Sequence, residues 1–418
     1  MKSRRIGIFT IIGPGILVAA TGVGAGDLAT GAFAGGHLGV TVLWAVLIGA
    51  GLKYTINEGL TRWQLVTGDT LIEGAMTRCG TVVKSCFLLY LLIWSCFVGA
   101  ALMSACGVAG HAILPLGDPT RDKIIYGLLN SFVALILVKL GGYKVFEKVM
   151  AVCIGAMFLI VIATAIALQP AWDEVVRGLL IPSFTRGDAE DLQWMIALIG
   201  GVGGTVTVLC YGYWIREEGR QSTDWIVPCR IDLAVGYAMT ALFGIAMVII
   251  GSQLADMENA GKPNANLIVT IADRLEPALG AAGPMARQAF FVGAWAAFFS
   301  SLLGVWQSVP YLFADVCSLM GKHNAERPVI NEKSKMSQWF LYGIATVPAM
   351  GLFVDFKQVQ KLYAFIGALC IPMLAIVLLW LNGSERRLGV YRNSWWSVIL
   401  LVAAVVFFAI FGSLSVFK

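Results

Sequence analysis

The sequence contains few charged residues, and this shortage excludes most soluble proteins. Asp, Glu, Lys and Arg together make up 13% of its 418 residues, whereas soluble domains carry about 25%. Apolar residues make up 58%, and the mean hydropathy is +0.79. Histidines number only 3, and the 9 cysteines include no CxxC pair, so neither a zinc site nor a disulfide framework is indicated. The composition therefore predicts an integral membrane protein.

Long polar stretches are also missing, so the sequence indicates no globular domain and no long tail. A single transmembrane domain over residues 1–418 is the economical interpretation. Apolar runs of about twenty residues, enough to cross about 30 Å of hydrocarbon, recur along the chain and predict about 11 transmembrane helices in an all-α polytopic fold. Their approximate ranges are 8–33, 40–64, 83–113, 123–141, 144–169, 190–216, 228–253, 286–316, 335–354, 358–381 and 394–416.

Glycines interrupt two of these apolar runs, at residues 22–27 in the first and at 200–204 in the sixth. Interrupted helices at corresponding positions of two halves mark the midplane site of a secondary transporter, because freed backbone groups in lipid must line a cavity. We therefore predict a five-plus-five inverted repeat with broken helices 1 and 6. The expected parts are repeat one at about 8–169, repeat two at about 190–381 and an extra helix at about 394–416.

The distribution of basic residues predicts how the chain is oriented. Lys and Arg are spread over short loops, which argues against a nucleic-acid partner. The longer loops near 170–190 and 254–285 carry fewer basic residues and more acids. The positive-inside rule then places the N-terminus in the cytoplasm and the C-terminus outside. We expect a protein of the bacterial inner (cell) membrane, in contact with the lipid bilayer, and the pattern indicates no particular oligomeric state.

Five short motifs keep a consistent spacing over most of the first eight predicted helices: Gly13-Pro14-Gly15, Leu43-Trp44, Arg62-Trp63-Gln64, Gly203-Gly204-Thr205 and Ser300-Ser301-Leu302-Leu303-Gly304. With these motifs the chain resembles the Nramp family of divalent-metal transporters. The resemblance implies the LeuT-type architecture. For the mechanism we predict alternating access, in which a bundle containing the first and sixth helices rocks against a scaffold of the third, fourth, eighth and ninth.

The metal-binding signatures of that family are altered in this chain. The family's Asp-Pro-Gly-Asn of the first helix reads Gly24-Ala25-Gly26-Asp27 here, and its Met-Pro-His of the sixth helix reads Thr207-Val208-Leu209. The acidic pair that the resemblance associates with proton movement falls on Ile93 and Cys96. We therefore expect a carrier without the family's usual proton relay. Loss of the methionine thioether, which favours softer transition metals, points to a hard divalent cation such as magnesium.

Asp27 is the acid that remains at the first interruption, and it is the candidate metal ligand. A charge near the bilayer centre costs roughly 2.5 to 3.5 kcal/mol even on lenient scales, so it is expected to face a polar cavity. With freed carbonyls and threonine hydroxyls it would form the oxygen shell that hard cations prefer. Alternatively, Asp27 caps the second half-helix by accepting from the N–H of Ala29 or Thr30. The predicted substrate-binding residues are Asp27, Gly24, Ala25, Gly26, Thr21, Thr205, Thr207 and Tyr211.

A second hypothesis gives the same interruptions a larger ligand. In amino-acid carriers of this fold the N-terminal end of a half-helix receives the substrate carboxylate, and unwound backbone binds the coupling cation. Tyr211 would contact an organic molecule there, although ordinary helix packing also explains it. The alternative function is carriage of a small organic solute, amino-acid-like or carboxylate. A sensor on a transporter scaffold is a third possibility, but the chain shows no added soluble domain through which it would signal.

Charged residues toward the helix ends are candidates for a gate. Lys53 and Glu58 on the second helix, and Glu58 with Arg62 one turn later, have a spacing that suggests pairs at a cytoplasmic gate. Arg216 and Glu217 end the sixth helix and are candidates for inner-gate ion pairs. No nucleophile and base pair and no HExxH motif occurs in any span, so we expect neither an enzyme nor a cofactor.

Overall fold

The computed structural model describes residues 13–183, 189–253, 267–278, 280–320 and 334–417, although the side chains of some residues within these ranges lie outside the description. Across these ranges the chain forms helices and turns and contains no strand. An apolar chain in lipid folds this way because a helix satisfies its backbone hydrogen bonds within one segment. The predicted all-α fold is confirmed.

The first half of the chain holds the helices up to the loop that precedes residue 189. They are α2 (Pro14–Gly22), the π-helix η1 (Val23–Ala29), α3 (Thr30–Leu38), the 3-10 turn η2 (Gly39–Val42), α4 (Leu43–Thr67), α5 (Leu71–Met76), α6 (Thr81–Ile113), α7 (Pro119–Ala167) and α8 (Trp172–Leu180).

The second half follows a similar succession of helices. They are α9 (Ala189–Gly201), η3 (Val206–Cys210), α10 (Tyr211–Glu217), η4 (Thr223–Trp225), α11 (Ile226–Ser252), α13 (Leu267–Ala278), η6 (Gly280–Ala282), α14 (Gly283–Met320), α15 (Lys335–Thr346), η7 (Val347–Phe353), α16 (Phe356–Ala368), α17 (Cys370–Asn382), α18 (Glu385–Leu388), η8 (Gly389–Tyr391) and α19 (Trp395–Phe417).

Within the described ranges, seven helical stretches are long and apolar enough to cross a membrane, or eight if the bent pair before and within α19 is one span. The expected number was about 11. The difference arises partly because the stretch Asp27–Thr67 joins the end of the first predicted span to the second, and the stretch Pro119–Ala167 joins the fourth to the fifth. The turn η2 separates the two spans in the first stretch. A kink separates them in the second, where Gly142 adopts φ 61° inside α7.

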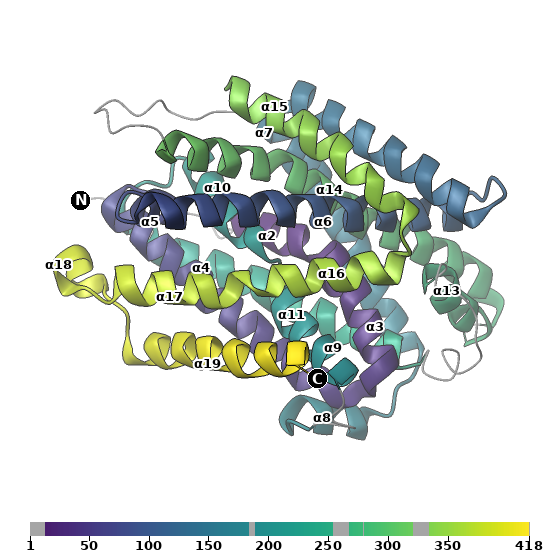
Figure 1. Ribbon diagram of the computed structural model, residues 1–418. Coiled ribbons are helices and arrows are strands. Elements are labelled where there is room, and N and C mark those ends of the chain that lie inside the picture. The colour runs from purple at the N-terminus through teal and green to yellow at the C-terminus, as the bar shows by residue number, and fades with distance from the viewer. Residues whose placement is uncertain (1–12, 184–188, 254–266, 279, 321–333, 418) are drawn as a thin grey trace, which may run out of the picture.

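The helices pack into one bundle in which α2 lies between two long helices (Figure 1). α2 contacts α11 on one side and α14 on the other, and α3 continues along α11 toward α9. α6, α7 and α14 pack against one another, with α15 beside them, and α17 packs against α19. The interrupted first helix is therefore buried at the centre, next to the interrupted sixth.

Candidate substrate site at the two helix interruptions

The sixth membrane helix is broken at its glycines. α9 ends at Gly201 and η3 begins at Val206, so the intervening residues leave the helical path. Gly203 and Gly204 adopt φ values of +74° and +90°, a region that residues with a side chain rarely enter. A break of this kind frees backbone groups, each of which costs several kcal/mol if it is unsatisfied in lipid.

Lys53 of α4 satisfies the carbonyls at this break. Its ammonium donates to the carbonyl of Gly200 at 2.8 Å and to that of Val202 at 3.1 Å. It also donates to the carbonyl of Gly204. The side chain is only 1% exposed, so the three carbonyls take the place of water around a buried ammonium. This end of α9 is thus anchored to α4 by one positive charge.

This arrangement corrects the expected pairing of Lys53 with Glu58. With 3.6 residues per turn, side chains five positions apart point to different sides of a helix. Lys53 therefore turns toward the broken helix. Glu58 instead forms ion pairs with Arg62 at 2.8 Å and with Arg230 at 2.7 Å. The predicted pair of Glu58 with Arg62 is present, and its gating role stays a prediction.

Asp27 lies on the other side of the same break. Its carboxylate is fully buried and accepts the backbone N–H of Gly203 at 3.2 Å. The alternative that Asp27 caps its own half-helix is wrong in this structure, since no side chain caps α3 and the N–H of Thr30 donates to the backbone carbonyl of Asp27. Lys53 and Asp27 therefore both bond backbone groups of the same break.

The interruption of the first helix takes a form that the glycines alone do not predict. Residues 23–29 form a π-helix between α2 and α3, in place of an unwound strand. Ser301 of α14 is inserted at its start, where the N–H of Gly24 donates to the Ser301 hydroxyl at 2.7 Å. That hydroxyl in turn donates to the carbonyl of Ala20 at 2.9 Å. Ser301 thus bridges two groups that would bond directly in an unbroken α-helix.

The two interruptions touch each other at glycines. A Cβ added to Gly22 would lie 2.4 Å from the backbone nitrogen of Gly204, so only glycine permits this approach of helix 1 to helix 6. Gly24 lies against Ser301 in the same way. Ala25 and Gly26 belong to the π-helix, but their surroundings lie outside the described part of the structure. The structure therefore brings Asp27 and the glycines around it together with the helix-6 break.

Two of the predicted threonine ligands form hydrogen bonds elsewhere. The Thr21 hydroxyl donates to the carbonyl of Leu17 in its own helix at 2.7 Å, and the Thr205 hydroxyl accepts from the indole N–H of Trp94 at 2.9 Å. Thr207 is buried in η3. The expected shell of threonine oxygens around Asp27 is thus not assembled by these bonds, because two of the hydroxyls serve helix packing.

Tyr211 lies toward the N-terminal end of α2 and bonds to a carboxylate that the sequence did not single out. Its hydroxyl donates to Asp232 of α11 at 3.0 Å. The same carboxylate accepts the backbone N–H of Gly13 at 3.0 Å and that of Gly15 at 2.8 Å. Asp232 therefore ties the start of the first helix to α10 and α11. The sequence signal that could have identified Asp232 is an acidic residue inside an apolar run.

Arg216 also has a partner different from the neighbours considered in the sequence. It pairs with Glu73 of α5 at 2.6 Å and donates to the carbonyl of Gly68 at 2.9 Å. Burial alone would raise the pKa of Glu73, but the ion pair with Arg216 and the hydrogen bonds with Thr70 together hold that pKa below its ordinary value. Glu217 ends α10, and a gating role for it and for Arg216 stays a prediction.

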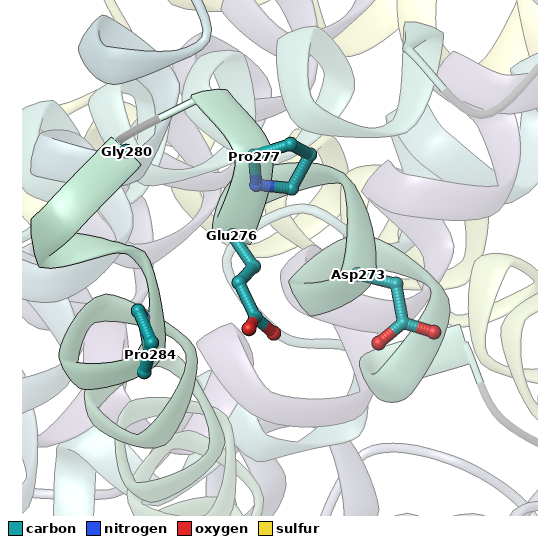
Figure 2. A pocket seen from close by; sticks show the side chains of 5 residues that line it. All are labelled: Asp273, Glu276, Pro277, Gly280 and Pro284. Atoms are coloured by element: carbon teal, nitrogen blue, oxygen red, sulfur yellow. The ribbon is translucent and has the colours of Figure 1, made fainter.

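A separate hollow of about 540 Å³ lies between α13 and the start of α14 (Figure 2). Its lining residues include Asp273 and Glu276, whose carboxylates face Arg287 at 3.3 Å and 3.5 Å. These side chains are 54% and 41% exposed, and exposed ion pairs contribute little to stability. The hollow is therefore an open surface feature, distinct from the buried site between Asp27 and Lys53.

The broken sixth helix, the π-interrupted first helix and the buried charges between them define an integral membrane protein with the LeuT-type fold. The family described as "Natural resistance-associated macrophage protein-like" matches residues 15–418. The chain belongs to this family, the Nramp family.

Particular relatives and solved structures agree with this assignment. A protein of Verminephrobacter eiseniae named divalent metal cation transporter MntH is 23% identical over 414 residues, covering 94% of this chain and 86% of the relative. A manganese-transporter mutant of Eremococcus coleocola superposes with a TM-score of 0.76 at 15% identity, covering 99% of this chain and 88% of that one. The transporter MhsT in complex with L-phenylalanine gives 0.56 at 16%, covering 96% and 98%.

Proposed function

We propose that this protein is a secondary transporter that moves a hard divalent cation, magnesium being the best candidate, by alternating access. The observation that carries the proposal is the fully buried Asp27 carboxylate held against the broken sixth helix. A buried carboxylate beside the backbone carbonyls that Lys53 binds offers the oxygen ligands that hard cations prefer. The family supports metal transport, since the MntH relative is named a divalent metal cation transporter.

The packing of the helices supports a rocking mechanism. α6, α7, α14 and α15 contact one another and would form the scaffold, while the helices on either side of the two interruptions would form the moving bundle. In this proposal the first repeat covers about 8–169, the second about 190–381, and the helix at about 394–416 is additional. Residues 8–12 of the first repeat lie outside the described part of the structure.

The protein would lie in a bacterial inner membrane, surrounded by lipid. The N-terminus is placed in the cytoplasm and the C-terminus outside, because this orientation puts the basic residues after α10 and around α18 on the cytoplasmic side. The basic residues before residue 13 and most of those between α14 and α15 belong to the part of the chain that is not described.

Transport without the usual proton relay is part of the proposal. Ile93 and Cys96, which stand where the family carries its acidic pair, are exposed on α6. An apolar side chain and an exposed thiol do not supply a buried carboxylate that would pass a proton toward the site. Transport and not catalysis is the activity that the matched relatives' names support.

Lys53 favours a second candidate substrate, a small organic carboxylate or amino acid. Its ammonium already binds the carbonyls of the break, so an inorganic cation would compete with it. A substrate carboxylate would instead be attracted by the ammonium. A metal cation would therefore compete with the Lys53 ammonium, whereas a substrate carboxylate would be attracted to it. Direct uptake measurements separate the two candidates.

Uptake by the purified protein in liposomes tests the proposal. We expect magnesium entry into vesicles with the wild-type protein, and a loss of at least about tenfold, or 1.4 kcal/mol, with Asp27→Asn. The matched control is Asp122→Asn. Asp122 is a carboxylate only 1% exposed, which accepts backbone N–H groups near the start of α7. Uptake of an organic carboxylate without any magnesium entry would overturn metal carriage and favour the second candidate.

A further inference from the structure

The strongest unexplained feature is a full-length lysine side chain turned into the centre of the bundle. Lys53 is 1% exposed, and removing an ammonium from water costs several kcal/mol unless it is well paired. It forms no ion pair within 4.0 Å among the described residues, and its bonds go to backbone carbonyls. This is the ligand set that proteins offer to hard metal ions.

The carbonyls converge on the ammonium because of the break itself. In a regular helix the carbonyls all point along the axis and are used by later N–H groups. Here Gly203 and Gly204 take positive φ values, and the carbonyls on both sides of them reach one nitrogen atom. The carboxylate of Asp27, bonded to the N–H between these carbonyls, adds a negative charge to the same place.

We propose that Lys53 is a tethered cation that occupies an oxygen-lined cation site at the helix-6 break, and that a free hard cation binds there only when the ammonium leaves. The inference rests on the proposed function for the nature of the cargo but goes beyond it, since it concerns what fills the site in the unloaded carrier. Lys53 then competes with free cations for the same carbonyls, which weakens cation binding and sets the cation specificity of the site. Its positive charge also repels a divalent ion near Asp27.

Replacing the ammonium by a neutral side chain tests this occupancy. Lys53→Met removes the charge, and Lys53→Gln keeps a donor for the carbonyls in case the methionine variant folds poorly. We expect magnesium chloride to raise the unfolding temperature of both variants in detergent, with a midpoint concentration at least about tenfold lower than for the wild type. Lys53→Arg, which keeps the charge, is expected to behave like the wild type. Choline chloride at equal ionic strength controls for general salt effects.

A matched lysine shows whether the effect belongs to the break. Lys123 is 8% exposed and donates to the carbonyl of Val354 at 2.7 Å, away from both interruptions. Lys123→Met is expected to gain no response to magnesium. If Lys53→Met and Lys53→Gln respond to magnesium no more than the wild type or Lys123→Met, the inference is wrong.

The two proposals fail separately. Absence of magnesium uptake by the wild-type protein, together with a gained magnesium response in Lys53→Gln, would overturn the proposed cargo and support the tethered cation. Magnesium uptake by the wild type, with no gained magnesium response in Lys53→Met or Lys53→Gln, would support the proposed cargo and overturn the tethered cation.

Discussion

At the scale of single residues, replacing Ser301 tests whether its bridging hydroxyl stabilises the interruption of the first membrane helix. Its hydroxyl accepts from Gly24 and donates to Ala20, both in the first membrane helix. We predict that Ser301→Ala lowers the free energy of unfolding by about 1–3 kcal/mol, because two buried backbone groups lose their partner. Denaturation of the detergent-solubilised protein measures this loss.

The neighbouring serine supplies the control for this prediction. Ser300 is equally buried, but its hydroxyl donates to the carbonyl of Ala297 in its own helix at 2.9 Å. Ser300→Ala is therefore expected to cost about 1 kcal/mol or less, because that carbonyl already belongs to a helix. Equal losses for the two variants would show that Ser301 does not support the π-helix.

Asp27 could be singled out from the sequence, whereas Lys53 and Ser301 could not be assigned their partners. An isolated carboxylate among glycines in an apolar run is unusual enough to mark a site. Lys53 bonds residues about 150 positions later in the chain, with separations of 147 and 149. Ser301 bonds Gly24 across 277 positions. Such partners depend on tertiary packing, and local spacing suggested a nearer but geometrically wrong partner for Lys53.

At the scale of elements, the left-handed glycines decide whether the sixth helix stays broken. A Cβ added to Gly203 would lie 2.7 Å from the ring of Tyr237, and its φ of +74° costs other residues roughly 1–2 kcal/mol. We predict that Gly203→Ala destabilises the protein by at least about 2 kcal/mol, combining backbone strain with overpacking. Thermal unfolding in detergent checks this.

A helical glycine with free space around it is the appropriate comparison. Gly155 lies in α7, and an added Cβ there would have no neighbour within 4 Å. Gly155→Ala is expected to be neutral or stabilising by up to about 1 kcal/mol, since alanine loses less backbone entropy in a helix. A similar cost for both substitutions would rule out a special conformation at Gly203.

Helix positions follow from the sequence more closely than helix interruptions do. Hydrophobic length alone locates α6, α11 and α14 to within several residues, because lipid permits little besides helices. The glycines also identify where the first and sixth helices are interrupted. The number of glycines does not distinguish an open break, as at Gly203, from the π-helix at residues 23–29. That difference depends on Ser301 entering one helix and Lys53 binding the other.

At the scale of the whole molecule, one ion pair joins parts of the bundle that are far apart in sequence. Glu73 of the short helix α5 and Arg216 of α10 meet at 2.6 Å, and α5 also contacts α14 and α17. In the proposed rocking mechanism, α10 would belong to the moving bundle and α14 to the scaffold. The pair would then join the two parts at this end of the bundle.

The lowered pKa of Glu73 gives this pair a pH dependence with a definite sign. The Arg216 pair and the hydrogen bonds with Thr70 overcome the effect of burial and hold the pKa below its ordinary value in the folded protein. The stabilisation is therefore fully present above the ordinary pKa and is lost as the pH falls through the lower, folded value. We predict that Glu73→Gln lowers the unfolding temperature most at about pH 7, and that wild type and variant converge as the pH falls through the lowered pKa of Glu73 in the folded protein.

Thermal unfolding scans over this pH range measure the convergence, and an exposed pair provides the control. Glu385 and Arg392 also meet at 2.8 Å, but their side chains are 73% and 58% exposed, so solvent screens them. Glu385→Gln should therefore shift the unfolding temperature little at any pH. A Glu73→Gln deficit that persists unchanged into acid would mean that the side chain stabilises the bundle by packing or neutral hydrogen bonds. In that case the charge of the Glu73–Arg216 ion pair would not be what stabilises the contact between α5 and α10.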